Sequence, residues 1–332
     1  MRIHVYLIGA IVIIAGRAIG SATGLDIGRS STLWHSLIFG VVVILIRQII
    51  RRWTPRLTYA STIFETSAIF LLSWEPILVI CYSAQTPSLP LCDDLYRSLD
   101  LLLGFDGAAV IEWMSHYPAL CWFMGIAYNM FFPSMFIVML FGGWFGSAYK
   151  IAERAAISII FAFLITAGLS SLFPAYGYGA YITPDLIRTV AIGATPIAQL
   201  DALRDGSMRI LDSSEGGGII TFPSMHWGLA IILLGTTSRL RWLFFMMVPI
   251  SLGLMATALV QGAHYLADAI AGAMVGGLSI IIADGFLSLP AIATLERALS
   301  EAGGRTAKAG SVAMSSKGFG LLVSRTRQRL SA

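Results

Sequence analysis

Runs of about 20 apolar residues follow one another along most of this chain, and that is the length an α-helix needs to cross a bilayer. Hydrophobic residues fill 57% of the 332 positions, charged residues only 12%, and the mean hydropathy is +0.79. A soluble domain has no way to bury that much apolar surface. The sequence therefore predicts an all-α fold, a polytopic bundle of helices integral to a membrane.

Eight spans account for the apolar runs, and the charges between them set their direction. Short loops rich in Lys and Arg stay in the cytoplasm, which places both ends of the chain inside. Residues 3–20 also resemble a secretory signal peptide, with a basic start and small residues near the end, but a first span is the favoured interpretation. The predicted spans cover residues 3–20, 33–50, 61–82, 118–141, 155–173, 222–238, 242–260 and 264–284.

The stretch FPSMH, residues 222–226, stands where the sixth apolar run begins. Pro223 suits a first helical turn, and Ser224 adds a hydroxyl beside the free amides of that turn. A helix start of this kind attracts anions, phosphate among them, so Ser224 is a candidate phosphate-binding residue. His226 is then expected within a few ångströms of a bound phosphate.

The stretch GAHYLAD, residues 262–268, precedes the last apolar run, and the span count puts it on the same outer face as FPSMH. His264 and Asp268 are four residues apart, so on a helix the carboxylate can accept the imidazole N–H. This fixes the tautomer and leaves the other ring nitrogen free to attack, while His226 moves protons. Two histidines and an aspartate can also hold zinc. Phosphoryl transfer is favoured, because Ser224 and the helix start suit an oxyanion, and no metal or other cofactor is expected.

At these residues the chain resembles the type-2 phosphatidic acid phosphatase superfamily, whose PSxH motif is similar to residues 223–226 and whose HxxxD motif is similar to His264 with Asp268. The likeness covers roughly residues 60–285. The context of both motifs is closest to the branch of the aureobasidin-sensitive inositol phosphorylceramide synthases and the sphingomyelin synthases. The resemblance implies a six-helix core, with His264 as nucleophile, Asp268 as its orienting partner and His226 as general acid and base.

Two cationic positions of the superfamily differ here. Its upstream KxxxxxxRP motif is not found, and Ala258 stands six residues before His264, where an arginine is expected. The long polar connection 174–221 offers Arg204 and Arg209 as replacements, because a guanidinium can bind two phosphate oxygens at once. The alternative for both arginines is pairing with nearby acids, namely Asp201, Asp205 or Asp212.

Several other polar groups allow either a structural or a functional interpretation. Glu65 and Glu75 lie in the third span, where an ionisable group is costly, and a structural role is favoured. Residues 95–114 mix apolar and charged positions, as an interfacial helix does, and such a helix either roofs the site or simply packs. Asn129 is expected to hydrogen-bond between helices, and Pro133 to bend its helix.

The sequence predicts three regions: two N-terminal helices in residues 1–58, a phosphatase-like catalytic membrane domain in 59–285, and a basic cytoplasmic tail in 286–332. We expect a lipid phosphotransferase that moves a phospho-headgroup between lipids through a phosphohistidine-type intermediate. With water as the acceptor the same site is a lipid phosphate phosphatase. A non-catalytic lipid-binding membrane protein is the second alternative.

The same features predict the partners and the location. The substrate is expected to be a phospholipid or lipid phosphate, and the acceptor a lipid or polyol. The bilayer is the other partner, and no nucleic acid is expected. The positive loops and the acidic connection near residues 83–117 favour an inner membrane of a bacterium, with the active site on the periplasmic face.

Overall fold

The computed structural model describes residues 3–27, 38, 41–42, 45–46, 49, 58–144, 149–190, 195–211, 218–261, 264–290 and 294. Residues 5–285 form one compact unit, and residues 1–4 with 286–332 are assigned to a second. The first unit carries every feature discussed below. Its helices and strands are α1 (Ile3–Thr23), β1 (Asp26–Ile27), α3 (Thr58–Ser83), α4 (Asp93–Leu102), α5 (Gly107–Ser115), α6 (Pro118–Asn129), α7 (Phe131–Trp144), α8 (Tyr149–Leu172), the 3-10 turn η3 (Tyr178–Ala180), α9 (Pro184–Thr189), α10 (Thr195–Arg204), β2 (Ile210–Leu211), α11 (Met225–Thr237), α12 (Arg241–Val260) and α13 (Leu266–Leu287).

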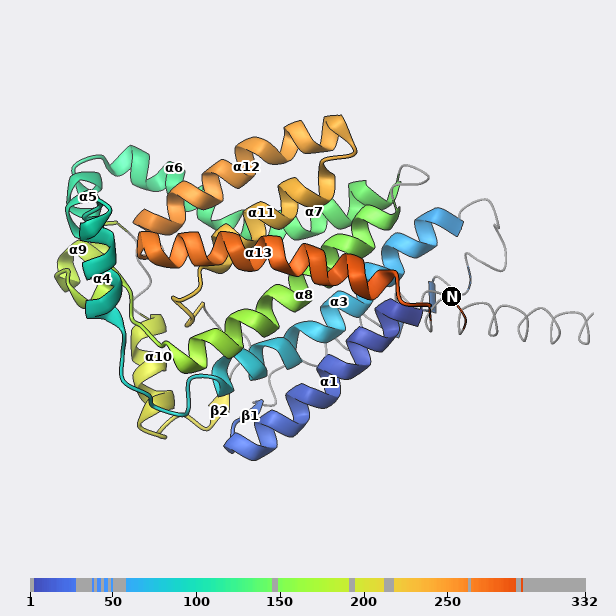
Figure 1. Ribbon diagram of the computed structural model, residues 1–332, viewed down its shortest axis with the longest axis horizontal. Helices are drawn as coiled ribbons and strands as arrows, with labels where there is room; N and C mark the ends of the chain where they lie inside the picture. The colour runs from blue at the N-terminus through green and yellow to red at the C-terminus, as the bar shows by residue number, and fades with distance from the viewer. Residues whose placement is uncertain are drawn as a thin grey trace, which may run out of the picture. The chain divides into compact units, whose positions relative to one another are not determined.

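The described part of the chain confirms the all-α membrane fold (Figure 1). Five of its helices are long and apolar enough to cross a membrane, namely α1, α3, α8, α12 and α13. The pair α6 and α7, bent by 45°, makes a sixth span when counted as one. The predicted sixth span is shorter than expected, since α11 has only 13 residues. The predicted span 33–50 lies almost entirely outside the described residues, so the expected total of eight is not reached within them.

The first apolar run forms helix α1, which packs along α3 through its glycines. Added Cβ atoms on Gly9 and Gly16 would lie 2.7 Å from Ile69 and 2.8 Å from Pro76 of α3, so only glycine permits this approach. A two-residue parallel pairing of β1 with β2 then joins the end of α1 to the segment after α10. Residues 3–20 therefore lie in a helix that packs against α3 and is long and apolar enough to cross a membrane.

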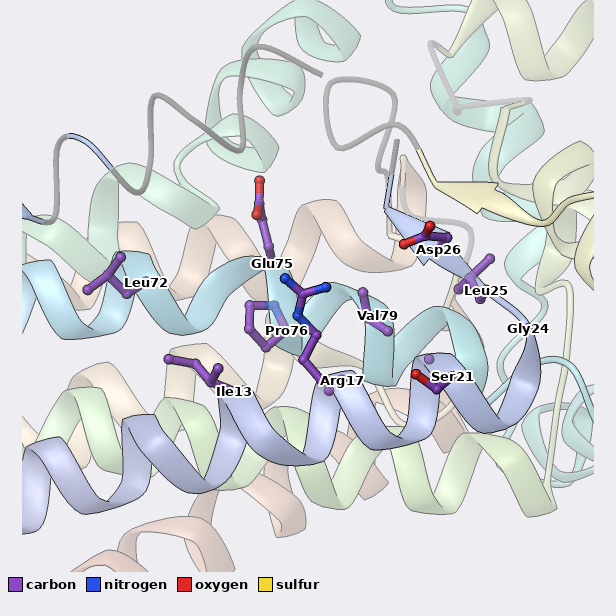
Figure 2. Close-up of a pocket in the computed structure, with 12 residues that line it drawn as sticks. Ile13, Arg17, Ser21, Gly24, Leu25, Asp26, Leu72, Glu75, Pro76 and Val79 are labelled. Carbon is purple, nitrogen blue, oxygen red and sulfur yellow. The ribbon is translucent and has the colours of Figure 1, made fainter. Parts of the chain in front are cut away.

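A cavity of about 480 Å³ opens between α1 and α3, and its lining includes Arg17, Asp26 and Glu75. Figure 2 shows Arg17 rising from α1 toward α3, while Glu75 of α3 points away from α1. The other glutamate of this span, Glu65, accepts a hydrogen bond from Tyr6. Both glutamates therefore lie where α3 meets its neighbours.

Helices α11 and α13 touch through their backbones. A Cβ on Gly272 would lie 2.9 Å from the carbonyl carbon of Ser224, and one on Gly276 would lie 3.0 Å from that of Gly228. The spacing of the two glycines on α13 is the small-xxx-small pattern that allows such close packing in a membrane. The contact fixes the start of α11 against α13.

Helices α4, α5 and α9 gather at one end of the bundle (Figure 1). The Tyr181 hydroxyl donates to Asp94 of α4, and the ring of Tyr178 packs against Phe105 and Tyr265. The predicted interfacial segment 95–114 is thus two short helices, α4 and α5, which pack on the connection after α8. They cover the end at which α13 begins.

Candidate active site

His226 lies in the first turn of α11, but the helix begins later than the sequence suggests. Ser224 is the N-cap residue, and Pro223 precedes it after a cis peptide bond, so Pro223 is not in the first helical turn. The Ser224 backbone N–H donates to the carbonyl of Asp268. This bond ties the helix start that carries one histidine to the helix that carries Asp268.

His264, unlike His226, lies outside its helix, two residues before α13 begins at Leu266. Its Nδ1 is 3.5 Å from Oδ2 of Asp268, within ion-pair range and longer than an ordinary hydrogen bond of about 3 Å. The same Oδ2 accepts the backbone N–H of Tyr265 at 3.0 Å, which fixes the carboxylate. His264 and Asp268 are therefore neighbours, as the sequence predicts, and Nδ1 of the imidazole faces the carboxylate while Nε2 is left for other contacts.

The two histidine rings meet although they are 38 positions apart in the chain. Their ring centroids are 6.1 Å apart and the ring planes cross at 61°. Both line a cavity of about 290 Å³ whose other walls come from α3, α6, α7, α8 and the segment 218–221. The structure therefore brings the histidines of the two motifs next to each other, as the sequence predicts.

Aromatic and aliphatic side chains dominate the walls of this cavity. Tyr128 stacks on His226 at 4.3 Å between ring centroids, and Phe131 lies 4.7 Å from the same ring. Further apolar wall residues are Trp74, Leu78, Phe132, Phe163, Ile219, Ile220 and Met225. The cavity therefore suits the hydrocarbon part of an amphiphile beside two polar rings.

Four buried polar atoms of the predicted site form no hydrogen bond with described residues: Ser224 Oγ, His226 Nε2, His264 Nδ1 and Asp268 Oδ1. Burial of such groups without partners is costly, and native proteins rarely tolerate it away from functional positions. Ser224 and Asp268 are fully buried, and His264 is only 5% exposed. The concentration of these atoms around two histidines marks this place as a site for a polar ligand.

Arg204 and Arg209 lie elsewhere and do not line the cavity. Arg204 donates from Nη2 to the Leu89 carbonyl at 2.7 Å, and Arg209 donates to the Thr23 carbonyl at 3.4 Å. In the described ranges neither forms an ion pair with Asp201 or Asp205, and Asp212 lies outside those ranges. Their role in phosphate binding stays a prediction.

Other predicted positions also differ in detail. Asn129 lines the cavity, but its side chain donates to the Gly125 carbonyl of its own helix at 2.7 Å, so the expected bond between helices is not formed. The bend falls at Met130, between α6 and α7, with Pro133 in the first turn after it. Within the described ranges no group of three or more His, Cys, Asp or Glu residues is arranged to hold a metal ion.

These features define the class: a polytopic helical membrane protein with a buried His–His–Asp site beside an apolar cavity. A family model described as the PAP2 superfamily matches residues 95–282, which is more than half of the chain, and the chain belongs to this superfamily. Membership confirms the predicted superfamily and supports lipid phosphatase or phosphotransferase activity in general. Neither a curated protein nor a solved structure matches the chain.

Proposed function

We propose that this protein is a lipid phosphotransferase that moves a phospho-headgroup from one lipid to another through His264. The observation that carries the proposal is that His226 and His264 line one apolar cavity, with Asp268 buried next to His264. Two imidazoles whose centroids are 6.1 Å apart can both contact one phosphoryl group, since each contact takes about 3 Å. Hydrolysis, with water as the acceptor, uses the same residues.

The first half of the reaction forms a covalent intermediate. Nδ1 of His264 faces Asp268, so Nε2 is the atom that attacks phosphorus. As the P–N bond forms, the P–O bond to the leaving alcohol breaks, and His226 gives that alkoxide its proton. The headgroup phosphate is then held on His264, next to the hydroxyl of Ser224 and the free amides at the start of α11.

The second half returns His264 to its starting state. His226, now neutral, takes the proton of the acceptor hydroxyl, whose oxygen forms a new P–O bond as the P–N bond breaks. A lipid or polyol hydroxyl gives headgroup transfer, as in the inositol phosphorylceramide and sphingomyelin synthase branch. Water gives a phosphatase. The apolar walls around His226 favour a lipid acceptor, because they hold hydrocarbon better than water.

Purified protein in detergent, given a phospholipid labelled in its headgroup phosphate, separates these outcomes. A new labelled lipid that forms only with an alcohol acceptor supports transfer, and release of the labelled phospho-headgroup into water supports hydrolysis. His264→Ala should abolish either reaction, while His116→Ala, at an exposed helix end that does not line the cavity, should leave it intact. Full activity of the His264→Ala protein would overturn the mechanism, and no labelled product from the unaltered protein would favour a lipid-binding role.

A further inference from the structure

Helix α4 turns two of its three acidic residues, Asp93 and Asp100, toward the protein and its leucines outward. Asp93 is 7% exposed and Asp100 is fully buried, whereas Leu95, Leu99, Leu102 and Leu103 are 40–83% exposed. A surface helix of a soluble protein has the opposite arrangement. Buried carboxylates need partners, and the partners of these two lie at the start of α13 and in the segment 176–178.

Asp100 binds the first turn of α13. Its Oδ2 accepts the Leu266 backbone N–H at 2.8 Å, and its Oδ1 accepts that of Ala267 at 2.9 Å. The Tyr178 hydroxyl donates to Oδ2 at 3.0 Å. The first amides of a helix have no partner within the helix, and a carboxylate there satisfies them and interacts favourably with the helix dipole. Asp100 thus caps α13 from another helix, 166 positions away in the chain.

Asp93 holds the residue between His264 and α13. Its Oδ1 accepts the hydroxyl of Tyr265 at 2.8 Å, and it also accepts the backbone N–H groups of Tyr176 and Gly177. Burial raises the pKa of the Asp93 carboxyl, while these hydrogen bonds act in the opposite direction. Tyr265 is itself fully buried and packs on Tyr178. The backbone on the helical side of His264 therefore has two separate attachments to α4.

We propose that Asp100 and Asp93 are positioning residues that hold His264 at the reacting phosphorus, with α4 anchored by its leucine face in the outer leaflet. The inference rests on the proposed function. His264 lies outside the helix: its backbone N–H donates to the Ala258 carbonyl at 3.2 Å, and on its other side its position depends on the three residues that follow it. Asp100 fixes Leu266 and Ala267, Asp93 fixes Tyr265, and together they determine where the imidazole lies relative to His226.

The helix also connects this geometry to the membrane. Its exposed leucines continue the apolar surface of a protein with several membrane helices, and a lipid leaflet is the partner that such a surface fits. The polar side of α4 is occupied by its bonds to α13. One face of this 10-residue helix thus meets the lipid leaflet, and the opposite face binds the segment next to His264.

The test compares Asp100→Asn with Asp94→Asn, a neighbouring acid whose side chain, among the residues the structure describes, accepts only the Tyr181 hydroxyl. An amide oxygen cannot accept both backbone N–H groups in the carboxylate's geometry. We expect kcat of the Asp100→Asn protein to fall roughly 10- to 100-fold with KM within about twofold, because a misplaced nucleophile loses rate and not substrate binding. The Asp94→Asn protein should keep its kcat. Hydrogen–deuterium exchange should be faster at the amides of residues 265–268 in the Asp100→Asn protein alone.

Unchanged kcat and unchanged exchange in a folded Asp100→Asn protein would overturn the inference, as would a rise in KM with kcat preserved. If the Asp100→Asn protein does not fold, kcat of the Tyr265→Phe protein tests the inference instead, because this change removes one hydrogen bond to Asp93 and keeps the ring packing. A several-fold lower kcat supports the inference, and an unchanged kcat rejects it. If the unaltered protein has no turnover, the proposed function fails, while the exchange measurement still tests whether Asp100 holds α13.

Discussion

Replacing Gly272 by alanine tests whether the backbone contact between α11 and α13 sets the distance between the two histidines. The new Cβ would lie 2.9 Å from the carbonyl carbon of Ser224 and nearer still to its oxygen. Carbon atoms in ordinary contact are about 3.5–4.0 Å apart, so one helix must move by about 1 Å. Because Ser224 is the N-cap residue of α11, the movement displaces His226 in the first turn of that helix.

The expected result is a loss of roughly 100-fold in kcat, which is what a misplacement of about 1 Å costs at a reacting centre. Gly277→Ala is the matched control, since a Cβ at that position on the same helix meets nothing within 4 Å. Both variants are assayed with the labelled phospholipid, and their thermal unfolding is measured in the same detergent. Unaltered kcat in the Gly272→Ala protein, with the control also active, would refute the argument that this contact positions the site.

Two further predictions concern parts of the molecule away from the histidines. Arg154 donates to both carboxylate oxygens of Asp284 at 2.6 and 2.7 Å, so Arg154→Ala should lower the free energy of unfolding by about 1 kcal/mol and leave kcat unchanged. The double variant with Asp284→Asn should be no less stable than Arg154→Ala alone. Losses of stability that add up in the double variant would contradict this prediction. Burial and the hydrogen bond to Asp94 raise the pKa of Tyr181 to about 12. The stabilisation from this tyrosine is therefore present below pH 10 and is lost as the pH rises through about 12. In thermal unfolding, the Tyr181→Phe protein should be less stable than the unaltered protein at about pH 9, and the difference between the two should shrink at about pH 11. A constant difference would contradict it.

The sequence predicts the membrane helices well because each one is specified locally. A run of apolar residues determines a span by its own length, without reference to distant parts of the chain. The convergence of His226 and His264 follows from counting spans and placing the basic loops. The packing role of Gly272 and Gly276 follows from their spacing alone, and the structure identifies α11 as the partner.

The residues that escaped prediction depend on contacts between distant segments. The inward position of Asp93 and Asp100 is set by partners that lie 78 or more positions away in the chain, so the local sequence of α4 does not identify those partners. The stacking of Tyr128 on His226 likewise requires that α6 and α11 meet. One signal was available for the aspartates: leucines at positions 95, 99, 102 and 103 share one helical face, which leaves the acids on another.

The short length of α11 sets an expected depth for the proposed reaction. Thirteen residues at 1.5 Å each extend about 20 Å, whereas the hydrocarbon of a bilayer is about 30 Å thick. If Arg239 and Arg241 lie at the cytoplasmic surface, as the loop charges predict, Ser224 and His226 are expected roughly 10 Å below the other surface. Under the proposed function, a reacting lipid would have to lower its phosphate that far, or the bilayer would have to thin around the protein, before any bond is made.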